Sequence, residues 1–378
     1  MGALGRIAHA AARVWDRSLD TLILFVTNAC GMKCPFCCYA ENLNQADDIP
    51  TDAMGKIARS IGPFRSLLCS GGEPFLRKDL AEVVRLFRAH AGVETVNIPT
   101  SGYYEERVAG LVESFFSSEE SEPHGTLLNI TVSLDGMAEY HDRQRGLPRT
   151  FEKAGATLDR LRALRERFPL LRTRVTSVVV GDNLDEIDRL IDHVARNHEV
   201  DEHGIGIARD LHVNASRHER HAPYVDGFHR LVHKTSVLYN RRGTQNRPKR
   251  PALPAGLMRH VTSALDQVYA DVVRGRVHGH PWPFPCVAGE SILVIDGAGS
   301  LKACELRDEV ADLRQHDFDV RAALASGAMK REVEAIRGAK CDCIHGCFIG
   351  ASMNKSPRQY LTRLPARVAR SVLTGGPS

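Results

Sequence analysis

Three cysteines fall within eight residues near the start of the chain, in the segment Cys30-Gly-Met-Lys-Cys34-Pro-Phe-Cys37. Their C-x3-C-x2-C spacing puts three thiols on one loop, directly after the apolar run Leu22–Val26. Three thiolates can hold three irons of a cubane iron–sulfur cluster, which leaves the fourth iron without a protein ligand. That iron then offers an open position at which a cofactor can bind.

Other uses of close cysteines fit this segment less well. A structural zinc site needs four ligands, which usually come as C-x2-C pairs. Ten cysteines in 378 residues are too few for a disulfide-stapled secreted domain, and Met1–Leu22 lacks the long apolar core of a secretory signal. Clustered, unpaired thiols instead predict a cytoplasmic protein.

A second motif, Gly71-Gly72-Glu73-Pro74, follows the predicted strand Arg65–Ser70. A glycine pair permits backbone conformations that other residues avoid, and it lets a ligand approach closely. The glutamate that follows can accept a hydrogen bond from an ammonium group. An ordinary turn is the alternative for this segment taken by itself.

Together these motifs resemble the radical S-adenosylmethionine (radical SAM) superfamily. The resemblance implies that a catalytic [4Fe-4S] cluster is held by Cys30, Cys34 and Cys37. It implies that S-adenosylmethionine binds this cluster, with its amino group against Gly71, Gly72 and Glu73. The activity implied is reductive cleavage to a 5′-deoxyadenosyl radical, which abstracts hydrogen from a substrate carbon. A flavodoxin- or ferredoxin-type protein would supply the electron.

The same resemblance extends to weaker positions. Phe36 stands where the family usually has an aromatic residue near the adenine. The segment 132–146 looks like the fourth-strand segment of the SPASM-containing branch, and this implies contacts of Ser133 with the ribose and of Arg145 with the methionine carboxylate. A surface ion pair is the alternative for Arg145. Cys38 and Cys69 match no cluster position, and we expect Cys69 to be a small buried strand residue.

A second cysteine set lies near the C-terminus. Cys286 and Cys304 enclose a predicted hairpin, with strands at 291–295 and 301–303. The Gly299-x4-Cys304 element resembles the start of a SPASM or twitch extension, which implies one auxiliary [4Fe-4S] cluster. The expected ligands are Cys286, Cys304 and Cys347, with Cys341 or Cys343 as the fourth. A zinc site is the alternative, and His345 could join it.

Strands and helices alternate through the first half of the chain. Predicted strands lie at 21–27, 65–70, 94–99, 127–134, 173–180 and 204–208, and predicted helices at 51–61, 75–91, from about 105, 150–168 and from 183. Alternation of this kind predicts a parallel sheet with right-handed crossovers, and six units predict a partial (β/α)6 TIM-like barrel. Both N-terminal motifs follow strands at their C-terminal ends, where such barrels carry their chemistry.

The rest of the chain is divided by composition and motif. The predicted parts are an N-terminal helix (1–20), the radical SAM partial barrel (21–210), a helical linker or insertion (211–284), the auxiliary-cluster domain (285–350) and a basic tail (351–378). The linker is rich in His and Arg, and its His212, His218 and His221 are expected on a solvated surface. The tail is expected to dock as a surface helix, with anionic lipid or RNA as the alternative partner.

Composition narrows the function classes. The 50 basic and 46 acidic residues give a net charge of +4, which does not predict a nucleic-acid partner, and no apolar stretch is long enough to span a membrane. Our leading hypothesis is a radical SAM enzyme, of an oxidoreductase type, that modifies a peptide. The alternatives are a radical SAM dehydrogenase acting on a small molecule such as a sugar, aminocyclitol or lipid precursor, and a zinc-dependent binding protein.

Overall fold

The structure is a computed structural model that describes residues 16, 18–45, 48–117, 125–209, 220–242 and 255–373. The predicted N-terminal helix falls almost wholly outside these residues, as do His212 and His218.

One nine-stranded sheet organises the described residues, in the order β6-β5-β4-β3-β2-β1-β7-β8-β9. The strands are β1 (Thr21–Thr27), β2 (Ser66–Gly71), β3 (Thr95–Thr100), β4 (Leu127–Ser133), β5 (Leu171–Val179), β6 (Glu202–Ile207), β7 (Ile292–Ile295), β8 (Ser300–Lys302) and β9 (Glu309–Asp312). Neighbours from β1 to β6 are parallel, which confirms the predicted partial barrel. The sheet does not close on itself.

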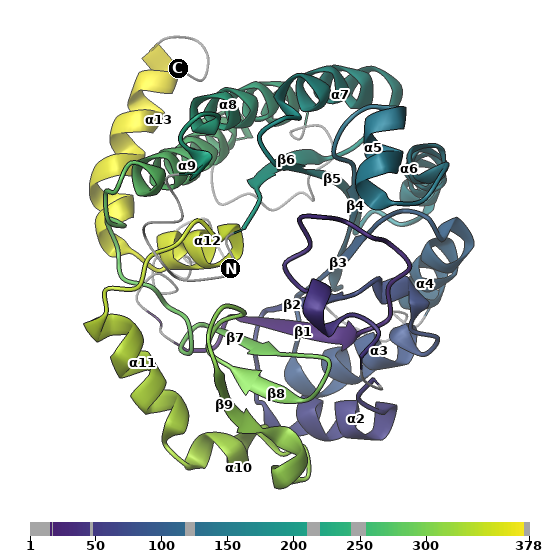
Figure 1. Cartoon of the computed structure of the whole chain (residues 1–378), viewed down its shortest axis with the longest axis vertical. Helices are drawn as coiled ribbons and strands as arrows, with labels where there is room; N and C mark the ends of the chain where they lie inside the picture. Colours follow the sequence, from purple (N-terminus) through teal and green to yellow (C-terminus); the bar gives the residue numbers. More distant parts are fainter. Residues whose placement is uncertain are drawn as a thin grey trace.

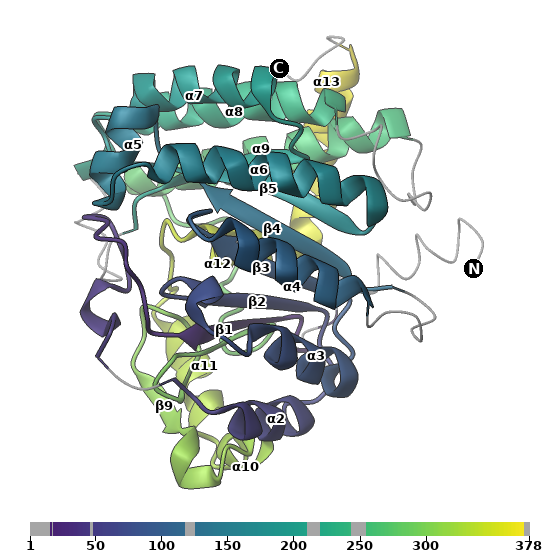
Figure 2. The same ribbon diagram turned by 90° about the vertical axis from the view of Figure 1, so that its right-hand side faces the viewer.

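Twelve α-helices of the described residues surround this sheet, most of them on its outer face (Figures 1 and 2). They are α2 (Thr51–Ser60), α3 (Leu80–Ala91), α4 (Glu105–Ser117), α5 (Ala138–Arg145), α6 (Thr150–Arg167), α7 (Leu184–Asn197), α8 (Val225–Arg242), α9 (Ala255–Val277), α10 (Val320–Ala325), α11 (Ala328–Gly338), α12 (Gly346–Asn354) and α13 (Leu364–Leu373). Figure 1 shows α12 near the middle of the view, inside the ring that the outer helices and the sheet form.

Side-chain pattern explains these elements. β5 alternates buried and half-buried residues along its whole length, as expected for a strand between an apolar helix layer and a more polar interior. Apolar residues at helical spacing on α7, such as Ile187, Leu190, Ile191 and Val194, are all fully buried. Gly92 ends α3 in the left-handed conformation, as its position after the apolar face predicts.

The segment that we expected to be a helical linker or insertion supplies two helices beside the barrel. α8 packs against β6 and α9, so it takes the place of the sixth outer helix. His221 is buried and bonds to the Tyr224 hydroxyl, whereas we expected it on a solvated surface. The expectation was wrong because a ring contact with Tyr224 buries the imidazole just before α8 begins.

The C-terminal extension shares the barrel's sheet. β7 pairs in parallel with β1, in register from Thr21↔Ile292 to Leu24↔Ile295. β7 and β8 form the predicted hairpin, and β9 adds a further antiparallel strand. The side of β1 away from β2 is therefore covered by the chain's last quarter.

Local predictions failed where distant side chains intervene. The helix expected at 75–91 is broken, because the buried Arg77 adopts an extended backbone and donates to the carbonyl oxygen of Val26 at 2.7 Å. Pro50 occupies the N-cap of α2, and the expected cap Thr51 bonds to Asp79 instead.

The predicted capping pair of α7 is also absent. Asn183 sits at the N-cap without a side-chain cap bond, and its side-chain amide donates to the carbonyl oxygen of Asp135 at 3.1 Å. Glu186 accepts from the backbone nitrogen of Met137. Both side chains join α7 to the loop after β4.

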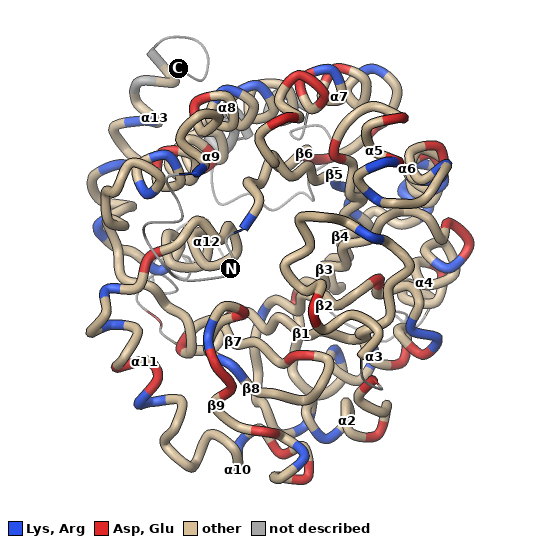
Figure 3. The backbone as a smooth tube through the Cα atoms, viewed as in Figure 1, with Lys and Arg blue, Asp and Glu red and all other residues tan. Residues whose placement is uncertain are grey.

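The tail docks on α9 through α13. Arg367 donates to Gln267 at 3.2 Å and pairs with Asp271, while Ser371 meets His260 at 2.8 Å. Basic and acidic residues alternate over the outer helices in Figure 3. Within the described ranges, no helix is both long and apolar enough to cross a membrane.

Candidate active site

The first cysteine set lies on the loop after β1, at the C-terminal end of the parallel strands. Cys30, Cys34 and Cys37 are half-buried free thiols. Burial, together with the neighbouring thiols of Cys38, Cys34 and Cys30, raises the pKa of the Cys37 thiol to about 11. The loop thus gathers the three predicted ligands in one neighbourhood.

Both glycines of the second motif are required because the backbone of the cysteine loop packs too closely against them for a side chain. A Cβ atom on Gly71 would lie 2.3 Å from the carbonyl oxygen of Thr27, and one on Gly72 would lie 2.2 Å from that of Ala29. Backbone bonds lock the contact, since Gly72 donates to Thr27 and Glu73 to Ala29, each at 2.8 Å. The cysteine loop therefore starts from a fixed platform on the end of β2.

Glu73 is buried beside this platform. Its carboxylate accepts from the Thr100 hydroxyl at 2.8 Å, and from the backbone nitrogen and hydroxyl of Ser101 at 2.7 and 2.6 Å. Ser101 thus fixes the carboxylate. Because Glu73 acts on the pKa of Cys30, it lies close to the first cysteine set.

Arg145 also reaches the first set. Its Nη1 donates to Cys34 Sγ at 3.7 Å, its Nη2 donates to Asp135 Oδ2 at 2.6 Å, and its guanidinium lies 5.9 Å from the ring centre of Phe36. Phe36 is half-buried, as is Ser133 at the end of β4. Arg145 is a buried residue, so the surface-pair alternative is wrong.

The second cysteine set comes from the C-terminal extension. Cys286, Cys304 and Cys343 are buried, and Cys341 is half-buried. Burial raises the pKa of all four thiols. Each thiol also interacts electrostatically with other cysteines of the set or with nearby charged residues. Cys304 responds to Cys286 and Cys341, and Cys343 responds to all three others. These four thiols form one neighbourhood.

Cys347 lies apart, in a junction between the two sets. The groups that act most on its thiol, after burial, are Arg209, Glu305 and Cys38. Cys38 follows the last cysteine of the first set and also responds to Arg209 and Glu305. The Cys347 side chain is exposed, yet burial raises its pKa to about 11.

Three polar side chains hold this junction together. Arg209, just after β6, pairs with Glu305, and its Nη1 lies 2.9 Å from His345 Nε2. His345 Nε2 in turn lies 2.5 Å from Glu305 Oε2. Burial raises the pKa of Glu305, but Arg209 and His345 outweigh it and lower the value to about 2. The sequence analysis missed Arg209 and Glu305. Arg209 directly follows a predicted strand, and Glu305 directly follows Cys304, so both positions could have been noted.

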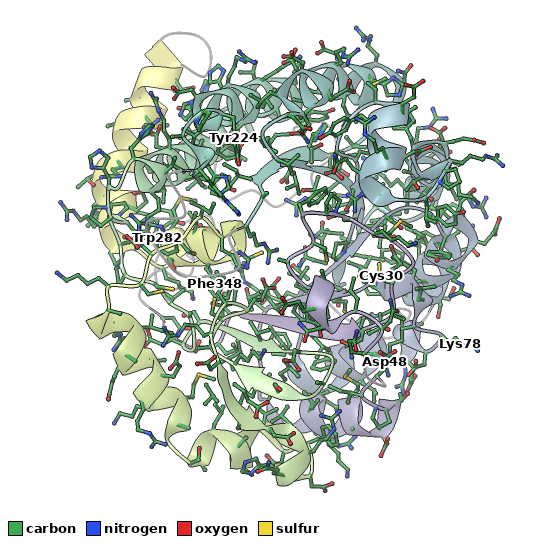
Figure 4. All side chains as sticks on the ribbon, viewed as in Figure 1. Cys30, Asp48, Lys78, Tyr224, Trp282 and Phe348 are labelled. Carbon is green, nitrogen blue, oxygen red and sulfur yellow. The ribbon has the colours of Figure 1, made fainter. Side chains whose placement is uncertain are left out.

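Figure 4 shows the arrangement from the open side of the barrel, with Cys30 and the α12 residue Phe348 on opposite sides of the centre. A cavity of about 370 Å³ lies elsewhere, at the amino-terminal ends of β4–β6, where its lining includes Asn129, Arg174 and His203. It is therefore separate from the cysteine loop. Cys69 is fully buried on β2 and takes no part in the site, as expected.

Both cysteine sets fit iron–sulfur clusters by residue chemistry and neighbourhood. Thiolates are the protein ligands of such clusters, and each set supplies the number that a cubane with or without an open iron needs. Across the described parts of the chain, no three His, Cys, Asp or Glu side chains already stand in metal-holding geometry. Each set therefore fits a cluster in the number and kind of its thiol ligands, which the fold brings near each other.

Comparison with known proteins agrees with this geometry. Residues 24–194 match the Radical SAM superfamily, so this part of the chain is a radical SAM domain. It is an enzyme of this class, whose members use a [4Fe-4S] cluster and S-adenosylmethionine.

Named relatives fall into one group. The chain is 28% identical to the GTP 3′,8-cyclase of Chlorobaculum tepidum over 49% of its own length and 53% of that protein. It is 23% identical to the "Probable GTP 3′,8-cyclase" of Metallosphaera sedula over 94% of its own length and 99% of that protein. The alignment with the first of these relatives thus spans about half of that protein.

Solved structures share the fold. "Native anSMEcpe with bound AdoMet and Cp18Cys peptide" superposes with a TM-score of 0.51 at 13% identity, covering 94% of this chain and 98% of that one. At this identity the likeness describes the fold only.

Proposed function

We propose that this enzyme carries two [4Fe-4S] clusters and acts on a small polar molecule bound between them. The observation that carries the proposal is the junction of Arg209, Glu305 and His345, which meets Cys38 beside the first cysteine set and lies next to the second. We place the substrate beside these polar side chains, between the two sets.

In this proposal the radical site is held by Cys30, Cys34 and Cys37, as predicted. A reduced cluster there supplies the electron that splits S-adenosylmethionine into methionine and a 5′-deoxyadenosyl radical. The Gly71-Gly72-Glu73 platform and the residues Phe36, Ser133 and Arg145 would surround the cofactor. The chain's own contribution is to orient the reactants and to keep water from them.

The auxiliary cluster is assigned to Cys286, Cys304, Cys341 and Cys343. This set differs from the sequence expectation, which had Cys347 in place of one of the last two. Cys347 groups with Cys38 and Arg209 instead, so we assign it to the wall of the substrate space. This arrangement supports a SPASM- or twitch-like role for residues 285–350, within the division of the chain predicted from the sequence.

A small polar substrate is supported by the junction and by the relatives. Arg209 uses Nη1 for Glu305 and His345, and its side chain is 30% exposed, which leaves donors for an acceptor group on the substrate. The curated relatives are named for a reaction of GTP, itself a small polar molecule. This favours the small-molecule hypothesis over peptide modification. Peptide modification stays a prediction, and so do the electron donor and the cytoplasmic location. All ten cysteines are free thiols, as that location would keep them.

Iron counting tests the cluster assignment. Anaerobically reconstituted protein should hold about eight irons, at four per cubane, and about four after Cys30→Ala/Cys34→Ala/Cys37→Ala or Cys286→Ala/Cys304→Ala/Cys341→Ala/Cys343→Ala. Zinc without iron in the wild-type protein would overturn the proposal and leave a zinc-dependent binding protein.

Substrate class is tested separately. With S-adenosylmethionine and dithionite, deuterated GTP or a mixture of deuterated sugar phosphates should transfer deuterium into 5′-deoxyadenosine. Transfer from deuterated peptides and from no small molecule would return the peptide hypothesis to first place.

A further inference from the structure

Arg145 occupies an unusual position for a residue predicted to bind only S-adenosylmethionine. Its guanidinium touches Cys34 Sγ at 3.7 Å, within the range of a hydrogen bond to sulfur. The residue is 9% exposed, so water competes little for this contact. Burial works against the charge of Arg145, while Asp135 and then Cys34 favour it and raise its pKa.

Asp135 holds Arg145 in this place. Asp135 is fully buried, and its Oδ2 accepts from Arg145 Nη2 at 2.6 Å. Its Oδ1 accepts from the backbone nitrogen of Val178 at 3.0 Å, and its own backbone nitrogen donates to His141 Nδ1 at 3.1 Å. The bond from β5 fixes the carboxylate, the bond to α5 fixes the backbone of Asp135, and the carboxylate in turn fixes the guanidinium.

We propose that Arg145 donates an N–H···S hydrogen bond to Cys34 that raises the reduction potential of the cluster held by the first cysteine set, with Asp135 as the positioning residue. This rests on the proposed assignment of Cys30, Cys34 and Cys37 as ligands. Hydrogen bonds to the sulfurs are one of the factors that set iron–sulfur potentials. A donor stabilises the reduced cluster because that state carries one more negative charge.

The hydrogen bond leaves room for the cofactor contact predicted from the sequence. Arg145 Nε is buried and has no hydrogen-bond partner among the described residues. The Nη atoms thus hold Asp135 and Cys34, and Nε is a donor that the described residues leave unused.

A redox titration followed by electron paramagnetic resonance tests the proposal. The first cluster is identified by the change of its signal when S-adenosylmethionine is added. Arg145→Met should lower its midpoint potential, and Arg143→Met on the same helix, whose guanidinium lies over the Tyr140 ring, should leave it unchanged. Arg145→Met/Asp135→Asn removes both members of the ion pair, so its remaining shift reports the hydrogen bond rather than the net charge.

The outcomes separate the two proposals. A wild-type midpoint in both Arg145 variants, with full iron content, overturns the hydrogen-bond role. Loss of the first-set irons from both variants, with the auxiliary irons retained, also overturns it, because Arg145 would then serve assembly instead. Absence of iron from the wild-type protein would be a failure of the proposed function, and it is seen before any variant is made.

Discussion

Gly72 and Ala29 approach each other so closely that a Cβ atom on Gly72 would lie 2.2 Å from the Ala29 carbonyl oxygen. Because the offending atom is backbone, the strain cannot be relieved by rotating a side chain. The contact makes the β2 platform and the cysteine loop one unit.

Gly72→Ala should therefore displace the cysteine loop and remove the first cluster. We expect iron content to fall from about eight to about four, at four irons per cubane, while the auxiliary signal persists. Gly110→Ala is the matched control, since nothing lies within 4 Å of its added Cβ on α4. Equal iron in the two variants would refute the platform role.

Cys343 and Cys347 make a second test, because spacing alone left their roles open. Cys343→Ala should lose the auxiliary cluster, or leave it unstable to dilution, while Cys347→Ala should keep all irons. The measurement is iron and sulfide content with electron paramagnetic resonance of both variants. Retention by Cys343→Ala and loss by Cys347→Ala would restore the ligand set expected from the sequence.

Ser101 should contribute to stability through the buried Glu73. Ser101→Ala removes one of the donors to this carboxylate, and a lost partner of a buried charged group costs about 1–3 kcal/mol. Ser117→Ala, at the exposed end of α4, should change the free energy of unfolding far less. Urea unfolding of the two variants measures the difference, and equal midpoints would contradict the expectation.

His203 should make the protein sensitive to mild acid. Burial lowers its pKa from 6.5 to about 3, so the unfolded chain takes up a proton that the folded chain refuses. The stability that the protein has with a neutral His203 is fully present above pH 6.5, and it is lost as the pH falls from there toward 3. Between pH 7 and pH 5 this loss amounts to about 2 kcal/mol.

His203→Gln should flatten this part of the pH dependence. The control is His90→Gln at an exposed position, which should keep the wild-type slope. Unfolding free energies at pH 7, 6 and 5 supply the comparison. A slope unchanged by His203→Gln would show that the imidazole protonates in the folded state.

Much of this architecture could be predicted from sequence because it depends on local pattern. The alternation of apolar strands and amphipathic helices predicted the partial barrel, and the spacing of Cys30, Cys34 and Cys37 indicated the family. The broken start of α3 could not be predicted, because its cause is a bond from Arg77 to Val26 across 51 positions. Likewise, Asp135 is an ordinary loop aspartate until the fold brings Arg145 and Val178 to it.

The junction shows the same limit. The local sequence does not predict that Cys347 lies near Arg209. Nor does it predict that Cys343, four residues earlier, lies near Cys286. Short cysteine spacings report that thiols are near each other along the chain. They do not report on which side of the first turn of α12 each thiol lies.

The parallel pairing of β7 with β1 has a consequence for how the chain folds during synthesis. The strand that covers the second edge of β1 is made some 270 residues after β1 itself, from Thr21 to Ile292. Until then β1 presents an apolar, unpaired edge of the kind that joins other chains. Contacts this distant in sequence also form slowly. The nascent barrel is thus most vulnerable to aggregation through β1, and the synthesis and pairing of β7 is the event that protects it.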